Sequence, residues 1–134
     1  MITLRLVTPY ADGFEREVDR VIVRGVLGDM MLMENTAPIV TPLDYGLIRI
    51  FEGGEEKQAT IHSGYMSMKE NVCTVATRAF EWIDEIDVER AEEAKRRAEE
   101  KLAELENDDD GHEEIEAQLS LLRALNRLRH AKYR

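Results

Sequence analysis

The sequence predicts a β + α protein, in which an antiparallel β-sandwich or barrel precedes two helices. Turn-forming residues gather in the first part, since all three prolines and seven of the eight glycines lie at or before residue 84. Short runs of alternating apolar and polar residues, typical of strands, occupy the same part. Beyond it, apolar residues recur every three or four positions, as on one face of a helix. We therefore expect two domains, 1–84 and 85–134.

Several runs of the first domain have the period-two pattern of a half-buried strand. Residues 2–7 alternate in this way and stop at Thr8-Pro9. Glycines 53 and 54 provide the positive φ angles of a tight hairpin, and residues 69–71 form a second turn. Many short strands with regular turn signals are typical of antiparallel sandwiches and barrels. The other strands that we expect span residues 21–24, 47–51, 58–62, 65–68 and 72–76.

The methionine-rich run Met30–Met33 admits two interpretations. Its side chains either fill the core or form an adaptable contact surface, because methionine repacks readily against a partner. His62 lies on an expected strand, and we interpret it as an ordinary structural residue.

The second domain is predicted to be an antiparallel helical hairpin. Asp87 is a suitable N-cap, since its carboxylate can accept from the backbone N–H of residue 89 or 90. A break at 107–111 separates the helices, and so short a loop favours an antiparallel pair. The first helix carries one narrow face of Ala91, Ala94, Ala98, Leu102 and Leu105. The second carries Ile115, Leu119 and Leu122, with a further row of Leu121, Leu125 and Leu128.

Charge divides the second domain by sign. Residues 85–116 carry a net charge of −10 and residues 117–134 a net charge of +5, within a total of −10 for the chain. The basic end can fold back onto the acidic helix or bind an acidic partner. A pI of about 4.8 argues against nucleic acid as the main partner, because phosphate binding needs a basic surface.

Arginines are expected to converge in the closed hairpin. Arg123 and Arg127 share one face of the second helix, and antiparallel packing returns them toward Asp87, Arg90 and Arg97. Their mutual repulsion opposes closure, and the narrow alanine face buries little apolar area. The closed state should therefore be marginally stable. A ligand with several negative charges would stabilise it through guanidinium–phosphate contacts.

Catalytic and metal motifs are missing from the sequence. It has no glycine-rich phosphate loop, its three histidines are dispersed, and Cys73 has no second cysteine to pair with. We therefore expect no catalytic residue, no metal site and no required cofactor. No run approaches the roughly 20 apolar residues of a membrane span, and the first residues lack the apolar core of a signal peptide.

The chain resembles the epsilon subunit of bacterial F-type ATP synthases. Residues 86–91 (IDVERA) are similar to the family's I/L-D-x-x-R-A element, and residues 122–128 (LRALNRL) to its last helix. The first domain agrees in Val7-Thr8-Pro9, in residues 37–43 and in Ser63-Gly64-Tyr65. It departs at residues 33–36, which read Met-Glu-Asn-Thr where the family has Leu-Pro-Gly-His.

The resemblance implies a flattened sandwich of about ten strands. It also implies a non-catalytic rotor subunit, held peripherally in the complex at the cytoplasmic side of the cell membrane. The sandwich would bind the gamma subunit and the c-ring. The helices would regulate ATP hydrolysis as a mobile arm that, when extended, reaches an acidic loop of the beta subunits, with alpha as a further candidate. Residues for that contact are Arg123, Arg127, Arg129 and Lys132.

Some family members bind ATP in the folded arm without hydrolysing it, and the resemblance places such a pocket here. Asp87 and Glu81 would serve the base and ribose, and the arginines the phosphates. Alternatively, Asp87 is only a helix cap and Arg90 only a partner of nearby acids. The implied pocket residues are Glu81, Ile86, Asp87, Arg90, Ala91, Arg97, Arg123 and Arg127.

A different class of function remains open on the residues alone. The chain could be a free-standing ligand-binding β-sandwich with a helical dimerisation tail. The alanine face argues against this alternative, because a stable dimer seam needs large apolar residues over several heptads. An enzyme is disfavoured by the missing motifs.

Overall fold

The computed structural model describes residues 1–9, 11–105 and 111–131, without the side chains of residues 111 and 112. The chain divides into two compact units, Met1–Trp82 and Ile83–Arg134. The turn expected at 107–110 and Lys132 lie outside the described residues. No helix in the described part of the chain is long and apolar enough to cross a membrane.

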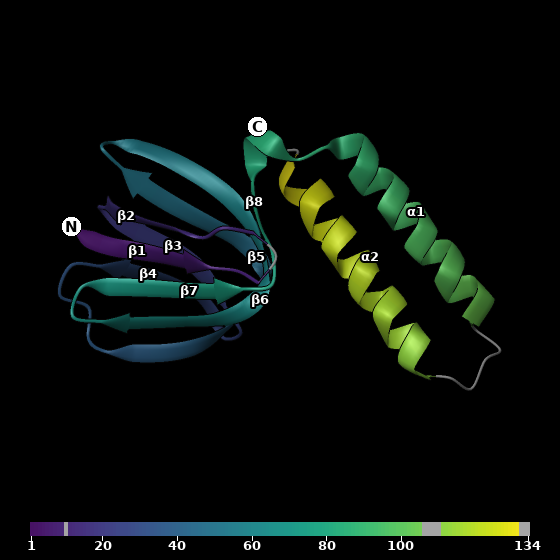
Figure 1. Cartoon of the computed structure of the whole chain (residues 1–134), viewed down its shortest axis with the longest axis horizontal. Helices are drawn as coiled ribbons and strands as arrows, with labels where there is room; N and C mark the ends of the chain where they lie inside the picture. Colours follow the sequence, from purple (N-terminus) through teal and green to yellow (C-terminus); the bar gives the residue numbers. More distant parts are fainter. Residues whose placement is uncertain (10, 106–110, 132–134) are drawn as a thin grey trace. The chain divides into compact units, whose positions relative to one another are not determined.

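The first unit is a β-sandwich built from one continuous hydrogen-bonded sheet (Figure 1). Its strand order is β2-β1-β7-β6-β5-β3-β4, and β8 pairs with β6. The strands are β1 (Ile2–Val7), β2 (Phe14–Val18), β3 (Arg20–Gly25), β4 (Gly28–Met33), β5 (Ile39–Glu52), β6 (Glu55–Lys69), β7 (Val72–Thr77) and β8 (Phe80–Trp82).

The long strands β5 and β6 each take part in both layers of the sandwich. The second half of β6, from Gly64 onward, pairs with β7, whereas its first half pairs with β8. Between the halves, Ser63 and Gly64 have φ angles of 59° and 138°, which bend the strand. The strands expected at 58–62 and 65–68 are therefore two halves of β6. Counting the halves of β5 and β6 separately turns the eight described strands into the ten that were expected.

One strand pair departs from the antiparallel pattern. Strand β1 pairs in parallel with β7, from Thr3 opposite Val72 to Val7 opposite Ala76. No tight turn joins these two strands, so no hairpin geometry forces them to run in opposite directions. Strands β2, β4 and β8 were not predicted, because the charged β2 and the methionine-rich β4 do not alternate cleanly and β8 has only three residues.

Buried and exposed side chains alternate along β4, so the residues of the methionine-rich run Met30–Met33 have different environments. Leu32 is fully buried in the core, and Met30 packs against it from a half-buried position. Met31 and Met33 remain 52% and 48% exposed. The core interpretation is confirmed for the alternate residues Met30 and Leu32, whereas a contact surface at Met31 and Met33 stays a prediction.

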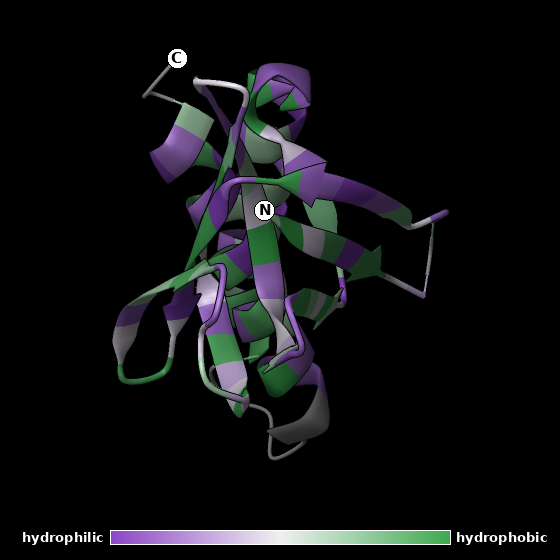
Figure 2. Ribbon diagram, turned by 90° about the vertical axis from the view of Figure 1, so that its left-hand side faces the viewer, coloured by the Kyte–Doolittle hydropathy of each residue, from purple (hydrophilic) through white to green (hydrophobic). Residues whose placement is uncertain are grey.

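Apolar residues of all the long strands meet between the layers, and hydrophobic and hydrophilic residues alternate along the strands (Figure 2). Phe14 of β2 stacks on Trp82 of β8, with ring centroids 5.8 Å apart. Burial raises the pKa of Cys73 to about 12, so its thiol stays protonated and unreactive. His62 is buried and stacks on Tyr45, in agreement with a structural role.

The second unit consists of a short 3₁₀ helix, η1 (Ile83–Glu85), and two helices, α1 (Val88–Leu105) and α2 (Gly111–Ala131). The two helices lie side by side in opposite directions (Figure 1). The buried residues of α1 are Ala91, Ala98 and Leu105, in agreement with the expected face. The leucine rows expected on α2 were wrong in part, since Ile115, Leu122 and Leu125 are exposed whereas Leu119, Leu121 and Leu128 are half-buried. The buried residues among those described in α2 are Ala117, Ala124, Asn126 and Ala131.

Gly64 provides a test of the bend in β6. A Cβ atom built on it would lie 1.9 Å from the carbonyl oxygen of Ala76, so Gly64→Ala should push β6 away from β7. We expect a loss of more than about 3 kcal/mol in the free energy of unfolding, measured by urea denaturation.

Gly28→Ala is the matched control for that substitution. Gly28 has a similar φ angle of 128°, but its Cβ would meet nothing within 4 Å. Its substitution should cost only the backbone strain, about 1–3 kcal/mol. Equal losses in the two variants would show that the close approach at Gly64 does not constrain the fold.

Candidate functional site

The helical unit begins with a capping interaction at Asp87. Its Oδ1 accepts a hydrogen bond of 3.1 Å from the backbone N–H of Arg90, and its carbonyl accepts from Ala91 N–H at 3.0 Å. Ile86, just before the cap, is buried. The sequence left two roles open for Asp87, a helix cap and a nucleotide ligand, and the structure contains the cap. Asp87 is also exposed to solvent.

A groove of about 480 Å³ lies between the two helices, and we call it the hairpin groove. Three alanines are among its lining residues. Charged and polar side chains from both helices line its walls. The lining residues are Ala94, Arg97, Ala98, Lys101, Glu113, Glu116, Ala117 and Ser120.

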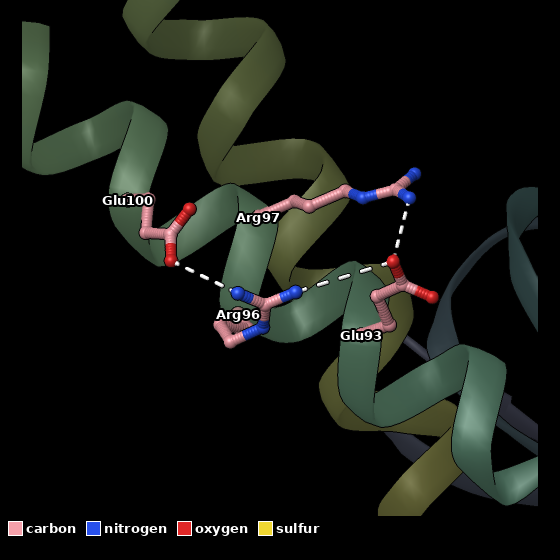
Figure 3. Close-up of polar contacts among 4 residues, drawn as sticks. All are labelled: Glu93, Arg96, Arg97 and Glu100. Atoms are coloured by element: carbon pink, nitrogen blue, oxygen red, sulfur yellow. Dashed lines mark hydrogen bonds and ion pairs between the residues drawn. The ribbon is translucent and has the colours of Figure 1, made fainter.

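One of the predicted arginines lines this groove, and a second contacts a residue that lines it. Arg97 lines it from α1 and donates to Glu93 Oε1 with an Nη2–O distance of 2.6 Å (Figure 3). Arg123 donates to the Oγ of Ser120, which lines the groove from α2, at 3.0 Å. Both guanidinium groups are therefore tied to the same groove, one directly and one through Ser120.

The remaining predicted residues divide between the units. Arg90 and Ala91 are in the first turn of α1, the former exposed and the latter buried. Arg127 is half-buried on α2, whose C-terminal half runs beside the start of α1. Arg129 is exposed near the end of α2. Glu81 lies on β8, in the sandwich unit.

A second concave surface lies on the sandwich, and we call it the sandwich groove. It encloses about 630 Å³. The three segments that carried the sequence resemblance in the first domain converge on it: residues 7–9, residues 42–43 and residues 63–65. Its walls are mainly apolar, and Val7 and Tyr65 are 50% and 63% exposed. The other lining residues are Ala76, Thr77 and Arg78.

Sequence reasoning missed Lys101, Glu113, Glu116 and Ser120 as lining residues, because a groove between helices depends on how they pack. A signal for the packing was present. Alanines recur every seven positions, at 117, 124 and 131 in α2. Such spacing places small side chains on one face of the helix at every second turn. The other helix can approach this face more closely than it can approach the leucine rows.

Two family models match the chain in succession. Residues 1–83 match the model described as ATP synthase, Delta/Epsilon chain, beta-sandwich domain. Residues 84–132 match the model described as ATP synthase, Delta/Epsilon chain, long alpha-helix domain. The two matches meet close to the boundary between the compact units.

Individual relatives agree with the family models. The ATP synthase epsilon chain of Caldanaerobacter subterraneus subsp. tengcongensis is 37% identical over 129 residues, which cover 96% of this chain and 91% of the relative. The ATP synthase epsilon chain of Desulforamulus reducens is 35% identical over 129 residues, 96% of either chain.

Solved structures share the fold. A chain in the cryo-EM structure of the Euglena gracilis mitochondrial ATP synthase (OSCP/F1/c-ring) superposes with a TM-score of 0.76 at 21% identity, covering 99% of this chain and 81% of that one. A chain in the Tetrahymena thermophila mitochondrial ATP synthase central stalk/c-ring structure gives a TM-score of 0.56 at 14% identity, covering 92% of either chain.

We call the buried alanines of the two helices the alanine seam, and they yield a prediction about the helical unit. They are Ala91, Ala98, Ala117, Ala124 and Ala131. Ala124 is 1% exposed, so Ala124→Leu should force the helices apart and cost about 1–3 kcal/mol of helical stability. The thermal loss of the helical circular dichroism signal measures this change. Leu122→Ala is the control, because Leu122 is exposed and its truncation should change stability by no more than about 0.5 kcal/mol. A larger effect at Leu122 would mean that the leucine row holds the helices after all.

Proposed function

This chain belongs to the ATP synthase delta/epsilon chain family, and from this we propose that it serves as a non-catalytic rotor subunit of the central stalk. In that role it helps to couple ion flow through the membrane to ATP synthesis. The observation that carries the proposal is the succession of two family matches over residues 1–132, in the order in which the structure places sandwich and helices.

The sandwich groove supports a contact with the gamma subunit. An apolar concave surface with an exposed tyrosine is typical of a protein interface. The groove gathers the segments that resemble the family most closely in the first domain. We propose that gamma occupies this groove, and that the same unit also contacts the c-ring from another part of its surface.

These proposed contacts imply that the chain is attached to the complex peripherally, through its protein partners. The described residues include no helix that could cross a membrane, so attachment through protein partners is the simplest arrangement. We propose that the chain sits in the complex on the cytoplasmic side of the cell membrane. Chains of the two mitochondrial complexes named above, one of them described as central stalk/c-ring, share the fold.

The helical unit is proposed to regulate ATP hydrolysis. Its thin alanine seam favours a hairpin that can open. Arg123, Arg127 and Arg129 give the C-terminal half of α2 the positive charge that suits an acidic loop of the beta subunits, with alpha as a further candidate. Lys132 would join them, by the resemblance alone.

A bound nucleotide would stabilise the closed hairpin. Arg97 in the hairpin groove, Arg123 beside Ser120, and Arg90 and Arg127 outside the groove offer guanidinium groups for phosphates. Asp87 and the buried Ile86 and Ala91 lie at the start of α1, where the resemblance puts the nucleoside. The assignment of Glu81 to the same ligand rests on the resemblance alone. We propose ATP as a regulatory ligand that is bound without hydrolysis.

The gamma contact can be tested by co-purification. Tyr65→Arg places a charge in the sandwich groove at an exposed position, so the fold should tolerate it while the complex with gamma is lost. Leu27→Arg is the control, since Leu27 is fully exposed in the β3–β4 turn and lies outside the groove. Retention of gamma by Tyr65→Arg would contradict the groove assignment. A chain that pairs only with itself would favour a free-standing sandwich with a dimerisation tail.

ATP binding can be tested by calorimetric titration, with and without magnesium. We expect saturable one-to-one binding to the full chain. Replacing Arg123 and Arg127 together by alanine should weaken it by more than about tenfold, since each removes a charge-assisted contact worth at least 1 kcal/mol. Arg129→Ala removes the same charge at an exposed position and should have little effect. No binding by the parent chain at millimolar ATP would reject ATP sensing and leave the stalk assignment in place.

A further inference from the structure

One guanidinium of the proposed polyphosphate site already has an anionic partner. Arg97 lines the hairpin groove, and its Nη2 lies 2.6 Å from Oε1 of Glu93, one turn earlier on the same helix (Figure 3). The same carboxylate oxygen lies 4.0 Å from Nη2 of Arg96. Glu93 therefore stands between two arginines and holds the one that faces the groove.

A phosphate bound by Arg97 would meet Glu93 as a competitor. A ligand oxygen that approached Nη2 would enter the space of the carboxylate, and its charge would repel that carboxylate across a few ångströms. A polyphosphate carries several negative charges, so the repulsion is multiplied. Phosphate binding through Nη2 of Arg97 therefore requires the side chain of Glu93 to turn away, and binding through the other N–H groups is weakened by its charge. Both side chains are exposed enough to do so, with Glu93 at 47% and Arg97 at 72%.

We propose that Glu93 is a built-in competitor that lowers the affinity of the helical unit for polyphosphates by occupying Arg97. This inference rests on the proposed function, and it adds a regulatory residue to the nucleotide site. The ligand class is a nucleotide with a polyphosphate chain. Glu93 acts only through Arg97 and is therefore a positioning residue. With Glu93 in place, the closed hairpin would respond only to high nucleotide concentrations.

The chain contains a matched control for this role. Glu100 accepts a hydrogen bond of 3.3 Å from Nη1 of Arg96, also at one-turn spacing on α1. Arg96 does not line the hairpin groove. Glu100→Gln thus removes the same charge and the same kind of helical ion pair as Glu93→Gln, but it leaves Arg97 paired (Figure 3).

The test is a calorimetric titration of the full-length chain with ATP and with inorganic tripolyphosphate, the latter to isolate the phosphate contacts. Glu93→Gln should bind both ligands about three- to tenfold more tightly than the parent, because a like charge and a competing partner are removed. Glu100→Gln should change affinity by less than about twofold, through general charge alone. Equal gains in the two variants would overturn the proposal.

A double-mutant cycle separates competition from a structural effect. In an Arg97→Ala background, Glu93→Gln should no longer tighten tripolyphosphate binding, since its gain depends on a freed Arg97. Glu93→Asp keeps the charge and should restore affinity close to that of the parent. A gain that persists without Arg97 would mean that Glu93 acts on the helix or on overall charge, and the proposal would fail.

Failure of this inference is distinguishable from failure of the proposed nucleotide site. If the parent binds ATP and loses it in the Arg123/Arg127 variant, while Glu93→Gln binds like Glu100→Gln, the site stands and the competitor role is wrong. If neither the parent nor Glu93→Gln binds either ligand at millimolar concentration, both are wrong. If Glu93→Gln binds the ligands and the parent does not, the result would support both the nucleotide site and the competitor role. Glu93 would then compete strongly enough to prevent measurable binding by the parent.

Discussion

The seam of small residues between α1 and α2 is the constraint on which the helical unit depends. Ala91 and Ala98 face Ala117, Ala124 and Ala131 along the hairpin, and alanine buries far less apolar surface than leucine. The association of the helices is therefore weak for their length. A weakly held pair can be opened or closed by charged ligands and partners, which is what a regulatory arm requires.

Charged side chains provide the other interactions of the helical unit, beyond the packing of the small residues. Arg97 and Ser120 line the hairpin groove from different helices, and Ser120 accepts a hydrogen bond from Arg123. Glu93 holds Arg97 by an ion pair within one helix. The guanidinium groups that form these contacts in the unit are the ones proposed to bind a polyanion. The sandwich differs in this respect, because its buried residues are mostly apolar and the close contact at Gly64 is steric.

Local patterns predicted much of this protein from its sequence. Alternating apolar residues located β1 and β7, the glycines at 53 and 54 located a hairpin, and Asp87 located the start of α1. They failed where the environment overrides the pattern. The leucines of α2 read as its packing face, yet Leu122 and Leu125 are exposed. The prediction followed size, whereas the close approach of two helices selects small side chains.

The sequence by itself determined the order of sandwich and helices, the cap at Asp87, the charge division and the family, because each of these depends on neighbouring residues or on a motif in one segment. Only the tertiary structure decided the parallel pairing of β1 with β7, the bend that makes β6 serve both layers, and the two grooves. These features depend on contacts between segments far apart in the chain. Glu93 and Ser120 stand beside Arg97 and Arg123 at one-turn spacing within their own helices, which a local pattern does encode. Which of these side chains line the hairpin groove depends on how the two helices pack.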